Sequence, residues 1–266
     1  MTKNNLIILK IGGSVITDKE NGRKIVKKNN LNRISREISE AKKKKGFSLV
    51  IVHGVGSFGH KLAKQFELSS GYKNKSQIKA ISDLCADLQE LNIEVKKHLK
   101  RNSINAITFQ QSSAWILNNK KLGKFDLTII KKYISLNLVP VLYGDVLIDS
   151  KLSFNILSGD KIIYYLAKEL KAKKVIIGTD VDGVFDCDPK IYKNANLINE
   201  VNNKNINHFY IGKSTSTDVT GGMKGKVDEL ISLSKFGIES EIINISKPNI
   251  LKKSLCGQKN IKTIIK

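Results

Sequence analysis

The regular alternation of short apolar segments with amphipathic segments constrains the fold of this chain more than any other feature. The apolar segments have the length of β-strands, and helix-like patterns separate most of them. This alternation is typical of strand–helix–strand units, which build a largely parallel sheet with helices on both faces. We therefore predict an α/β fold. The predicted strands span residues 5–11, 48–53, 104–109, 139–143, 173–178, 240–245 and 261–265.

One long amphipathic helix is predicted from Ser76 to about Arg101. Its apolar side chains recur at steps of three and four and form one stripe, which indicates packing on the core or at a subunit interface. Because the helix follows a glycine-rich loop, the stripe is also a candidate wall for an apolar pocket beside a phosphate. Residues 146–154 are predicted to form a β-hairpin, and residues 186–218 to form surface loops. The stripe consists of Ile78, Ile81, Leu84, Leu88, Leu91, Val95 and Leu99.

The formal net charge of +22 raises the question of nucleic-acid binding, because basic surfaces attract phosphate backbones. Only four of the 46 basic residues are arginine, and the lysines are scattered along the chain. Lysine recognises bases and phosphates less specifically than arginine, so nucleic-acid binding is not predicted as the main function. Cys85, Cys187 and Cys256 form no CxxC pair, so no zinc site or disulfide framework is predicted. Without an 18-residue apolar stretch or a signal-peptide pattern, we expect a cytoplasmic protein with no membrane partner.

The sequence HGVGSFGH, residues 53–60, follows a predicted strand and is a candidate phosphate-binding loop. Its glycines fit the GxGxxG pattern of dinucleotide-binding folds. That pattern also needs an acidic residue at a strand end about 20 positions later, and here this position lies in the predicted long helix. The phosphate loop of nucleotide hydrolases needs Lys and then Ser or Thr directly after its last glycine, where this chain has His60 and Lys61. Neither interpretation fits the loop.

Glycine-rich turns with a nearby charged residue follow most of the predicted strands. In a parallel sheet the carboxyl ends of the strands meet at one edge, and ligands bind there. Backbone N–H groups in such turns can approach phosphate oxygens closely. Six turns at one edge therefore predict a large phosphorylated ligand set. The turns are Leu9–Thr17, Gly54–Gly59, Tyr143–Val146, Leu157–Ile162, Gly178–Phe185 and Asp218–Lys226.

The segment Asp180-Val181-Asp182-Gly183 also matches the DxDG motif of phosphatases that form an aspartyl-phosphate. In those enzymes the motif opens the chain and the magnesium-binding acidic motif follows it. Here 179 residues precede the motif, and the candidate acidic motif SGD comes before it. The order argues against a phosphatase, which stays an alternative together with a nucleotide- or RNA-binding protein without catalytic activity.

Taken together and in this order, the motifs resemble those of the amino acid kinase superfamily, and most closely its isopentenyl phosphate kinase branch. The matching stretches are LKIGGS with a second lysine at Lys19, HGVGSFGH ending in His60, VPVLYGDV, SGD, GTDVDGV and DVTGGMKGK. The histidine that ends the glycine loop marks the branch. The resemblance implies a three-layer αβα sandwich with a mostly parallel sheet, usually in a homodimer. Residues 1–172 would hold the acceptor phosphate and residues 173–266 would hold ATP.

The resemblance further implies that isopentenyl phosphate reacts with ATP to give isopentenyl diphosphate and ADP, a step of isoprenoid biosynthesis. Mg²⁺ would arrive bound to ATP, and no metal-ligating residues are expected. Kinases of the same superfamily that act on fosfomycin, UMP or glutamate are alternatives. Val55 stands where the branch often has glycine, and Gln110–Gln111 lie in a segment where it commonly has proline. Both departures concern the acceptor.

The resemblance assigns roles to individual residues of this chain. Catalytic roles fall on Lys10, His60, Asp160 and Lys226, with Asp160 holding the two lysines in position. Acceptor-binding roles fall on Gly13, Lys19, Gly54, Gly59, Ser158 and Gly159. ATP-binding roles fall on Lys10, Gly12, Ser14, Thr179, Asp180, Asp182, Gly183, Gly222 and Lys226. Asp182 has a second interpretation as a residue that only shapes a turn.

Overall fold

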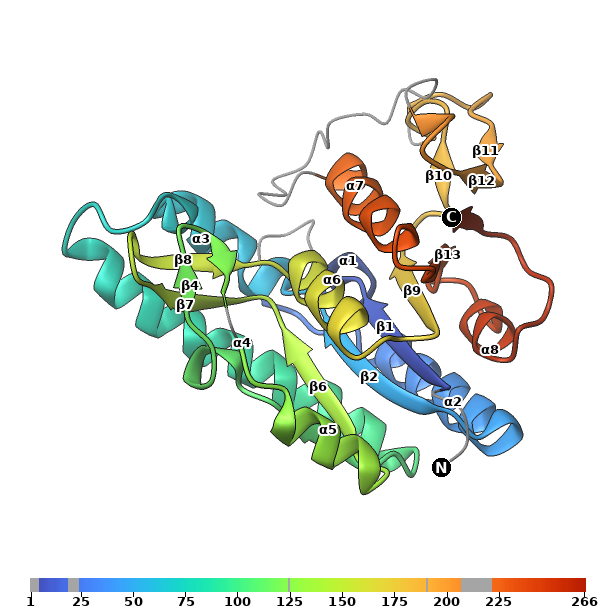
Figure 1. Ribbon diagram of the computed structural model, residues 1–266, viewed down its shortest axis with the longest axis horizontal. Helices are drawn as coiled ribbons and strands as arrows, with labels where there is room; N and C mark the ends of the chain where they lie inside the picture. The colour runs from blue at the N-terminus through green and yellow to red at the C-terminus, as the bar shows by residue number, and fades with distance from the viewer. Residues whose placement is uncertain (1–4, 19–23, 124, 190, 207–221) are drawn as a thin grey trace.

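The computed structural model describes residues 5–18, 24–123, 125–189, 191–206 and 222–266 (Figure 1). Within these residues, eight strands form one sheet in the order β12-β14-β13-β9-β1-β2-β6-β3. Neighbouring strands run parallel, except that β13 and β14 are antiparallel. The strands are β1 (Leu6–Ile11), β2 (Ser48–His53), β3 (Ala106–Thr108), β6 (Val139–Tyr143), β9 (Lys174–Thr179), β12 (Glu200–Val201), β13 (Glu239–Asn244) and β14 (Thr263–Ile265). All seven predicted strands are confirmed.

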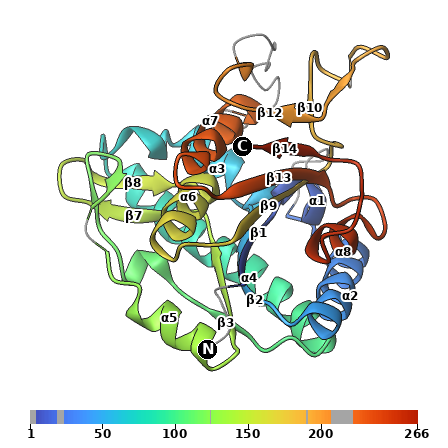
Figure 2. The ribbon, with the colours of Figure 1, turned by 45° about the vertical axis from the view of Figure 1, so that its right-hand side comes forward.

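Helices cover both faces of this sheet, as Figure 2 shows. Helices α2, α4 and α8 bury apolar side chains on one face, and α5, α6 and α7 on the other. The predicted three-layer sandwich is therefore confirmed. The helices are α1 (Gly13–Ile16), α2 (Lys28–Lys45), α3 (His60–Gln65), α4 (Ser76–Arg101), α5 (Thr128–Ser135), α6 (Gly159–Glu169), α7 (Gly222–Ser234) and α8 (Ile250–Leu255). No helix in the described ranges is long and apolar enough to cross a membrane.

Strand β1 shows how the sequence assigns side chains to the two layers. All six of its residues are buried, as expected for a central parallel strand. Ile7, Leu9 and Ile11 pack with α2 and α4, whereas Leu6 and Ile8 pack with α6. Because side chains alternate along a strand, Lys10 points to the α6 side. A lysine in this core needs a partner there.

The long helix α4 begins and ends at the predicted residues. Five members of its apolar stripe, from Leu84 to Leu99, are buried in the core, and Ile81 is half-buried. Ile78 is 57% exposed, so the core packing of the stripe begins later than predicted. Helix α4 packs against β3 and β6 and contacts the 3₁₀ turn at Gly56–Phe58, which fixes the helix next to the glycine loop.

A second, smaller sheet adjoins the main one and contains the predicted hairpin. It has the order β5-β4-β7-β8, and β7 and β8 pair antiparallel. The carboxylate of Asp149 accepts hydrogen bonds from backbone N–H groups of both adjacent turns, which fixes the turn between these strands. The strands are β4 (Leu117–Asn118), β5 (Lys121–Leu122), β7 (Asp145–Asp149) and β8 (Ser153–Leu157).

The prediction of surface loops over residues 186–218 was incomplete. Within its described part, the two-residue strand β11 (Leu197–Ile198) pairs with β10 (Val184–Phe185), and β12 joins the edge of the main sheet. Strands of two residues are too short to show periodicity in the sequence. Residues 190 and 207–218 of the segment lie outside the described residues. Short 3₁₀ turns complete the structure at η1 (Gly56–Phe58), η2 (Leu68–Ser70) and η3 (Gln111–Ser113).

Candidate active site

Strands β1, β2 and β9 are neighbours in the sheet, and the glycine turns that follow them meet at its carboxyl edge. The backbone N–H of Gly12, after β1, donates to the carbonyl of Gly178 in β9 at 2.8 Å. The N–H of Gly54, after β2, donates to the carbonyl of Ile11 at 2.8 Å. The predicted meeting of strand-end turns is therefore present for these three loops.

The loops after β1 and β2 approach each other backbone to backbone, and this requires glycine. A Cβ at Gly13 would lie 2.4 Å from the nitrogen of Gly56, and a Cβ at Gly54 would lie 2.4 Å from the nitrogen of Gly13. Gly56 has a φ of +50°, in the left-handed region that side chains disfavour. The absence of side chains at these positions thus lets the two loops meet at the carboxyl edge of the sheet.

Thr17 ties the two glycine loops together, and sequence reasoning missed it. Its hydroxyl donates to the carbonyl of Gly13 at 2.7 Å and accepts from the N–H of Ser57 at 3.1 Å. The residue is fully buried. The only signal in the sequence was its place at the end of the LKIGGSVIT stretch, because the contact with Ser57 joins segments 40 residues apart.

The carboxylate of Asp160 lies between two lysines that are distant in the sequence. The ammonium of Lys10 contacts Oδ1, and the ammonium of Lys226 lies 3.8 Å from Oδ2. The three side chains are 8–14% exposed. Lys10 comes from the end of β1, Asp160 from the first turn of α6, and Lys226 from the second turn of α7. The structure therefore brings together the three residues to which this role was assigned.

The beginning of α6 faces the glycine loops. Ser158 precedes the helix, and its side chain accepts a hydrogen bond from the N–H of Lys161 at 3.3 Å. Gly159 lies next to Lys10, whose Cε would be in ordinary contact, at 3.8 Å, with a Cβ added to Gly159. Its nitrogen lies 3.3 Å from the position of a Cβ on Gly144. An N-terminal helical turn beside a buried lysine provides positive potential for an anion.

His60 is the first residue of α3 and directly follows the glycine loop, and its side chain is half-buried. The preceding Gly59 contacts Val55, because a Cβ on Gly59 would lie 2.7 Å from Val55 Cγ2. The other γ-methyl of Val55 approaches Gly144. Val55, one of the departures from the branch pattern, thus fills the space between two glycines of adjoining loops.

His53, the first residue of the same motif, is fully buried and was not assigned a role from the sequence. Its Nδ1 lies 3.1 Å from the carbonyl of Gly54, and Asn92 donates to its Nε2 at 3.1 Å. The ring also stacks on Tyr143. Burial lowers the pKa of His53 to about 4, so the imidazole is neutral at neutral pH. His53 therefore supports the glycine loop from inside the core.

Gln110, the other departure from the branch pattern, connects two polar groups of the β6–β7 region. It donates to the carboxylate of Asp145 at 2.8 Å and accepts from the hydroxyl of Tyr143 at 2.5 Å. Asp145 is buried, and this burial raises the pKa of its carboxyl. Cys85 on α4 also contacts this carboxylate, at 3.9 Å. Gln110 thus belongs to a polar cluster with Tyr143, Asp145 and Cys85.

The residues assigned to ATP follow β9 in a turn that is held by its own side chains. The hydroxyl of Thr179 bonds to the backbone of Val181. The carboxylate of Asp182 accepts from Asn244 at 3.1 Å and from Lys247 at 2.7 Å. This geometry agrees with the interpretation of Asp182 as a residue that shapes the turn. Asp180, between them, is exposed.

The remaining assigned residues lie in several places. Gly12 and Ser14 flank Gly13 in the loop after β1. Gly183 packs against β14, because a Cβ there would lie 2.4 Å from Thr263 Oγ1. Gly222 is the first residue of α7. Lys19 lies outside the described residues. Among the residues that the structure describes, no group of three or more His, Cys, Asp or Glu side chains is arranged to hold a metal ion.

Comparison with known proteins places this arrangement in a family. A model of the amino acid kinase family matches residues 5–244. The isopentenyl phosphate kinase of Methanothermobacter thermautotrophicus is 38% identical over 259 residues, which cover 95% of this chain and 96% of that protein. The protein of the same name from Methanocaldococcus jannaschii is 37% identical over 261 residues, covering 95% and 96%.

Solved structures of known proteins have the same fold as this chain. An X-ray structure of isopentenyl phosphate kinase has a TM-score of 0.84 at 34% identity and covers 98% of this chain and 100% of that one. UMP kinase from Ureaplasma parvum, at 20% identity and a TM-score of 0.67, shares the fold. The resemblance inferred from the motifs is thus confirmed. Because the family match spans most of its length, this chain belongs to the amino acid kinase family and is a phosphotransferase.

Proposed function

We propose that this protein transfers the γ-phosphoryl group of ATP to isopentenyl phosphate and so forms isopentenyl diphosphate and ADP. The observation that carries the proposal is the carboxylate of Asp160 between the ammonium groups of Lys10 and Lys226, beside glycine loops with bare backbone. Two lysines held in this way suit a reaction that brings two anions together. The named relatives supply the identity of the acceptor.

Phosphoryl transfer between two phosphates needs positioning and positive charge more than covalent chemistry. In the proposed mechanism an oxygen of the acceptor phosphate attacks the γ-phosphorus in line, and ADP leaves from the opposite side. Lys10 and Lys226 stabilise the charge that spreads over the transferring oxygens. The negative charge of Asp160 offsets the repulsion between the two ammonium groups and fixes their orientation. It takes no proton in this scheme.

The two substrates are assigned to the two parts of the chain. Residues 1–172 would hold the acceptor phosphate through the amides of Gly13, Gly54, Gly59 and Gly159, through Ser158, and through the side chains of Lys19 and His60. Residues 173–266, with Gly12 and Ser14, would hold ATP along the turn after β9 and the start of α7. His60 would donate a hydrogen bond to the acceptor phosphate, and this bond is stronger when the ring is protonated.

Mg²⁺ is proposed to enter with ATP. Asp160 already contacts two ammonium groups, so it is poorly suited to bind a divalent cation directly. Nucleotide phosphates and water would then supply the oxygen ligands that Mg²⁺ prefers. The same family resemblance leads us to propose a homodimer and a cytoplasmic location.

An ADP-release assay with a panel of acceptors tests the proposal. The panel contains isopentenyl phosphate, dimethylallyl phosphate, geranyl phosphate, fosfomycin, glutamate and UMP, and ³¹P NMR identifies the product. We expect a clear preference for the two short isoprenyl phosphates and a new diphosphate signal. A preference for UMP or glutamate would refute the acceptor. Hydrolysis of a generic phosphoester without ATP, abolished by Asp180→Asn, would support the phosphatase alternative instead.

A further inference from the structure

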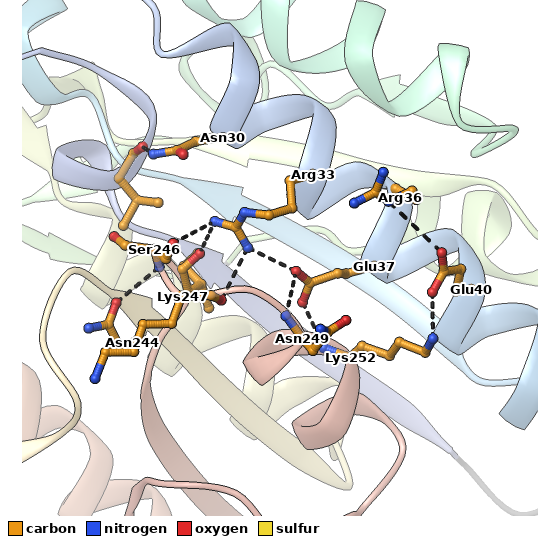
Figure 3. A network of polar contacts seen from close by, with 12 residues as sticks. Asn30, Arg33, Arg36, Glu37, Glu40, Asn244, Ser246, Lys247, Asn249 and Lys252 are labelled. Carbon is orange, nitrogen blue, oxygen red and sulfur yellow. Dashed lines mark hydrogen bonds and ion pairs between the residues drawn. The ribbon is translucent and has the colours of Figure 1, made fainter.

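One arginine on α2 binds three consecutive carbonyl groups in the segment that follows β13. The guanidinium of Arg33 donates to the carbonyls of Ile245 at 2.6 Å, Ser246 at 3.1 Å and Lys247 at 3.2 Å (Figure 3). Its side chain is only 15% exposed. Three successive carbonyls that point to one place repel one another, so this backbone conformation depends on the cation that they share.

Glu37, one helical turn further along α2, binds both Arg33 and the other end of the same segment. Its carboxylate accepts from Arg33 at 2.8 Å and from the N–H groups of Asn249 and Lys252 at 3.0 and 3.1 Å. The side chain is 3% exposed. The Arg33–Glu37 pair therefore binds carbonyls at one end of segment 245–252 and N–H groups at the other (Figure 3). It fixes the segment against α2 at both ends.

The same segment contacts the turn assigned to ATP. The N–H of Ile245 donates to the carbonyl of Thr179 at 3.0 Å. Lys247 donates to the carboxylate of Asp182 at 2.7 Å. Asn244, the last residue of β13, bonds to Asp182 and to the carbonyl of Asp180. The three residues that make these contacts, Asn244, Ile245 and Lys247, each lie within one position of a carbonyl that Arg33 binds.

A second contact leads from the segment to the loop after β1. The side chain of Ile245 covers Gly178 so closely that a Cβ there would lie 2.4 Å from Ile245 Cδ1. The carbonyl of Gly178 accepts the hydrogen bond from Gly12. A shift of Ile245 would therefore displace both the turn after β9 and the backbone beside Lys10.

We propose that the Arg33–Glu37 pair is a positioning element for the nucleotide. It holds segment 245–252, and through this segment it sets the turn at residues 179–182 and the backbone of Gly12 in the geometry that receives ATP. This inference rests on the proposed function. Arg33 and Glu37 act through the segment without touching either substrate.

The test compares Arg33→Met with Arg36→Met in the full-length protein. Arg36 lies on the same helix, but its side chain is 62% exposed, and it reaches the segment only through a 3.9 Å contact with Glu40, which accepts from Lys252. It is therefore a control for the loss of an arginine that contacts none of the three carbonyls. Calorimetry measures the Kd of ATP without acceptor, and steady-state kinetics give the KM of each substrate. We expect Arg33→Met to weaken ATP binding about tenfold and to change the acceptor KM less than about twofold. Arg36→Met should leave both unchanged.

Arg33→Lys serves as a second variant if Arg33→Met does not fold. A lysine keeps the charge but cannot hold three carbonyls, so its Kd should lie between those of the wild type and Arg33→Met. A folded Arg33 variant with wild-type ATP affinity would overturn the inference, and so would an equal rise in both KM values. Absence of ATP binding by the wild type would instead overturn the proposed function itself.

Discussion

The ammonium of Lys10 contacts the carboxylate of Asp160, although 150 residues separate them in the chain. Both side chains are less than 10% exposed. Burial of a charge without a partner costs free energy of folding, so each of these two residues offsets the cost of burying the other. The contact also fixes the end of β1 relative to the start of α6, and the glycine loops lie beside it.

Lys10→Ala and Lys226→Ala should each lower kcat by a factor of about 10² to 10³, because each removes a preorganised charge from the transferring phosphoryl group. The exposed Lys44 provides the control, and Lys44→Ala should leave kcat unchanged. Single-turnover measurements separate this step from product release. A Lys10→Ala enzyme with more than about half of the wild-type rate would remove Lys10 from the mechanism.

Asp160→Asn should reduce kcat while the KM values for ATP and acceptor change little. The positive charges that attract both anions remain, but the two lysines are no longer held in position. Because the substitution breaks a buried ion pair, the free energy of unfolding should also fall by about 3 kcal/mol. Urea unfolding and steady-state kinetics measure the two effects. A rise in KM with unchanged kcat would contradict a positioning role.

Gly13→Ala should abolish activity and destabilise the protein, because the new Cβ would lie 2.4 Å from the nitrogen of Gly56 and force the two loops apart. Gly123, which has no atom within 4 Å of its Cβ position, is the matched control. Gly123→Ala should keep wild-type activity and melting temperature. An active, stable Gly13→Ala protein would show that the close approach of the loops is dispensable.

The stability of the protein should depend on pH through His53. Its folded pKa of about 4 lies below the value of about 6.5 expected in the unfolded chain, so the unfolded state binds the proton first as the pH falls. The contribution of neutral His53 to the free energy of unfolding is therefore full at pH values above the unfolded pKa, and it decreases as the pH falls from about 6.5 toward 4. Between pH 7 and pH 5 the wild type should lose about 2 kcal/mol more than His53→Gln. Urea unfolding at both pH values measures this difference. If the wild type and His53→Gln lose the same free energy of unfolding between pH 7 and pH 5, His53 is not held neutral.

The sequence predicted the main sheet and the long helix because their patterns are local. Each predicted strand is a largely apolar run bounded by turn residues, and the stripe of α4 consists of seven apolar side chains at steps of three and four. The short strands β11 and β12 have no such pattern. Ile78 continued the period of α4 in the sequence, but burial depends on what the rest of the chain places against it.

The candidate site was predictable only in part, for a related reason. Lys10 is a charged residue in the otherwise apolar strand β1, and the glycine motifs indicate where the backbone carries no side chains. Thr17 was marked only by its place at the end of the LKIGGSVIT stretch, and Arg33 belongs to no motif, because their roles come from contacts with residues far away in the chain. Arg33 contacts Ile245, which lies 212 residues later, and no local period or motif encodes that contact.

A crystal structure with isopentenyl phosphate and a non-hydrolysable ATP analogue would show where the two reacting phosphates lie relative to the lysines. We expect the acceptor phosphate to lie on the glycine loop beside His60, and the terminal phosphate of the analogue to lie between Lys10 and Lys226. Both lysines should be within hydrogen-bonding distance, about 3 Å, of that phosphate. A complex with the two phosphates bound apart from each other, or away from these lysines, would contradict the proposed mechanism.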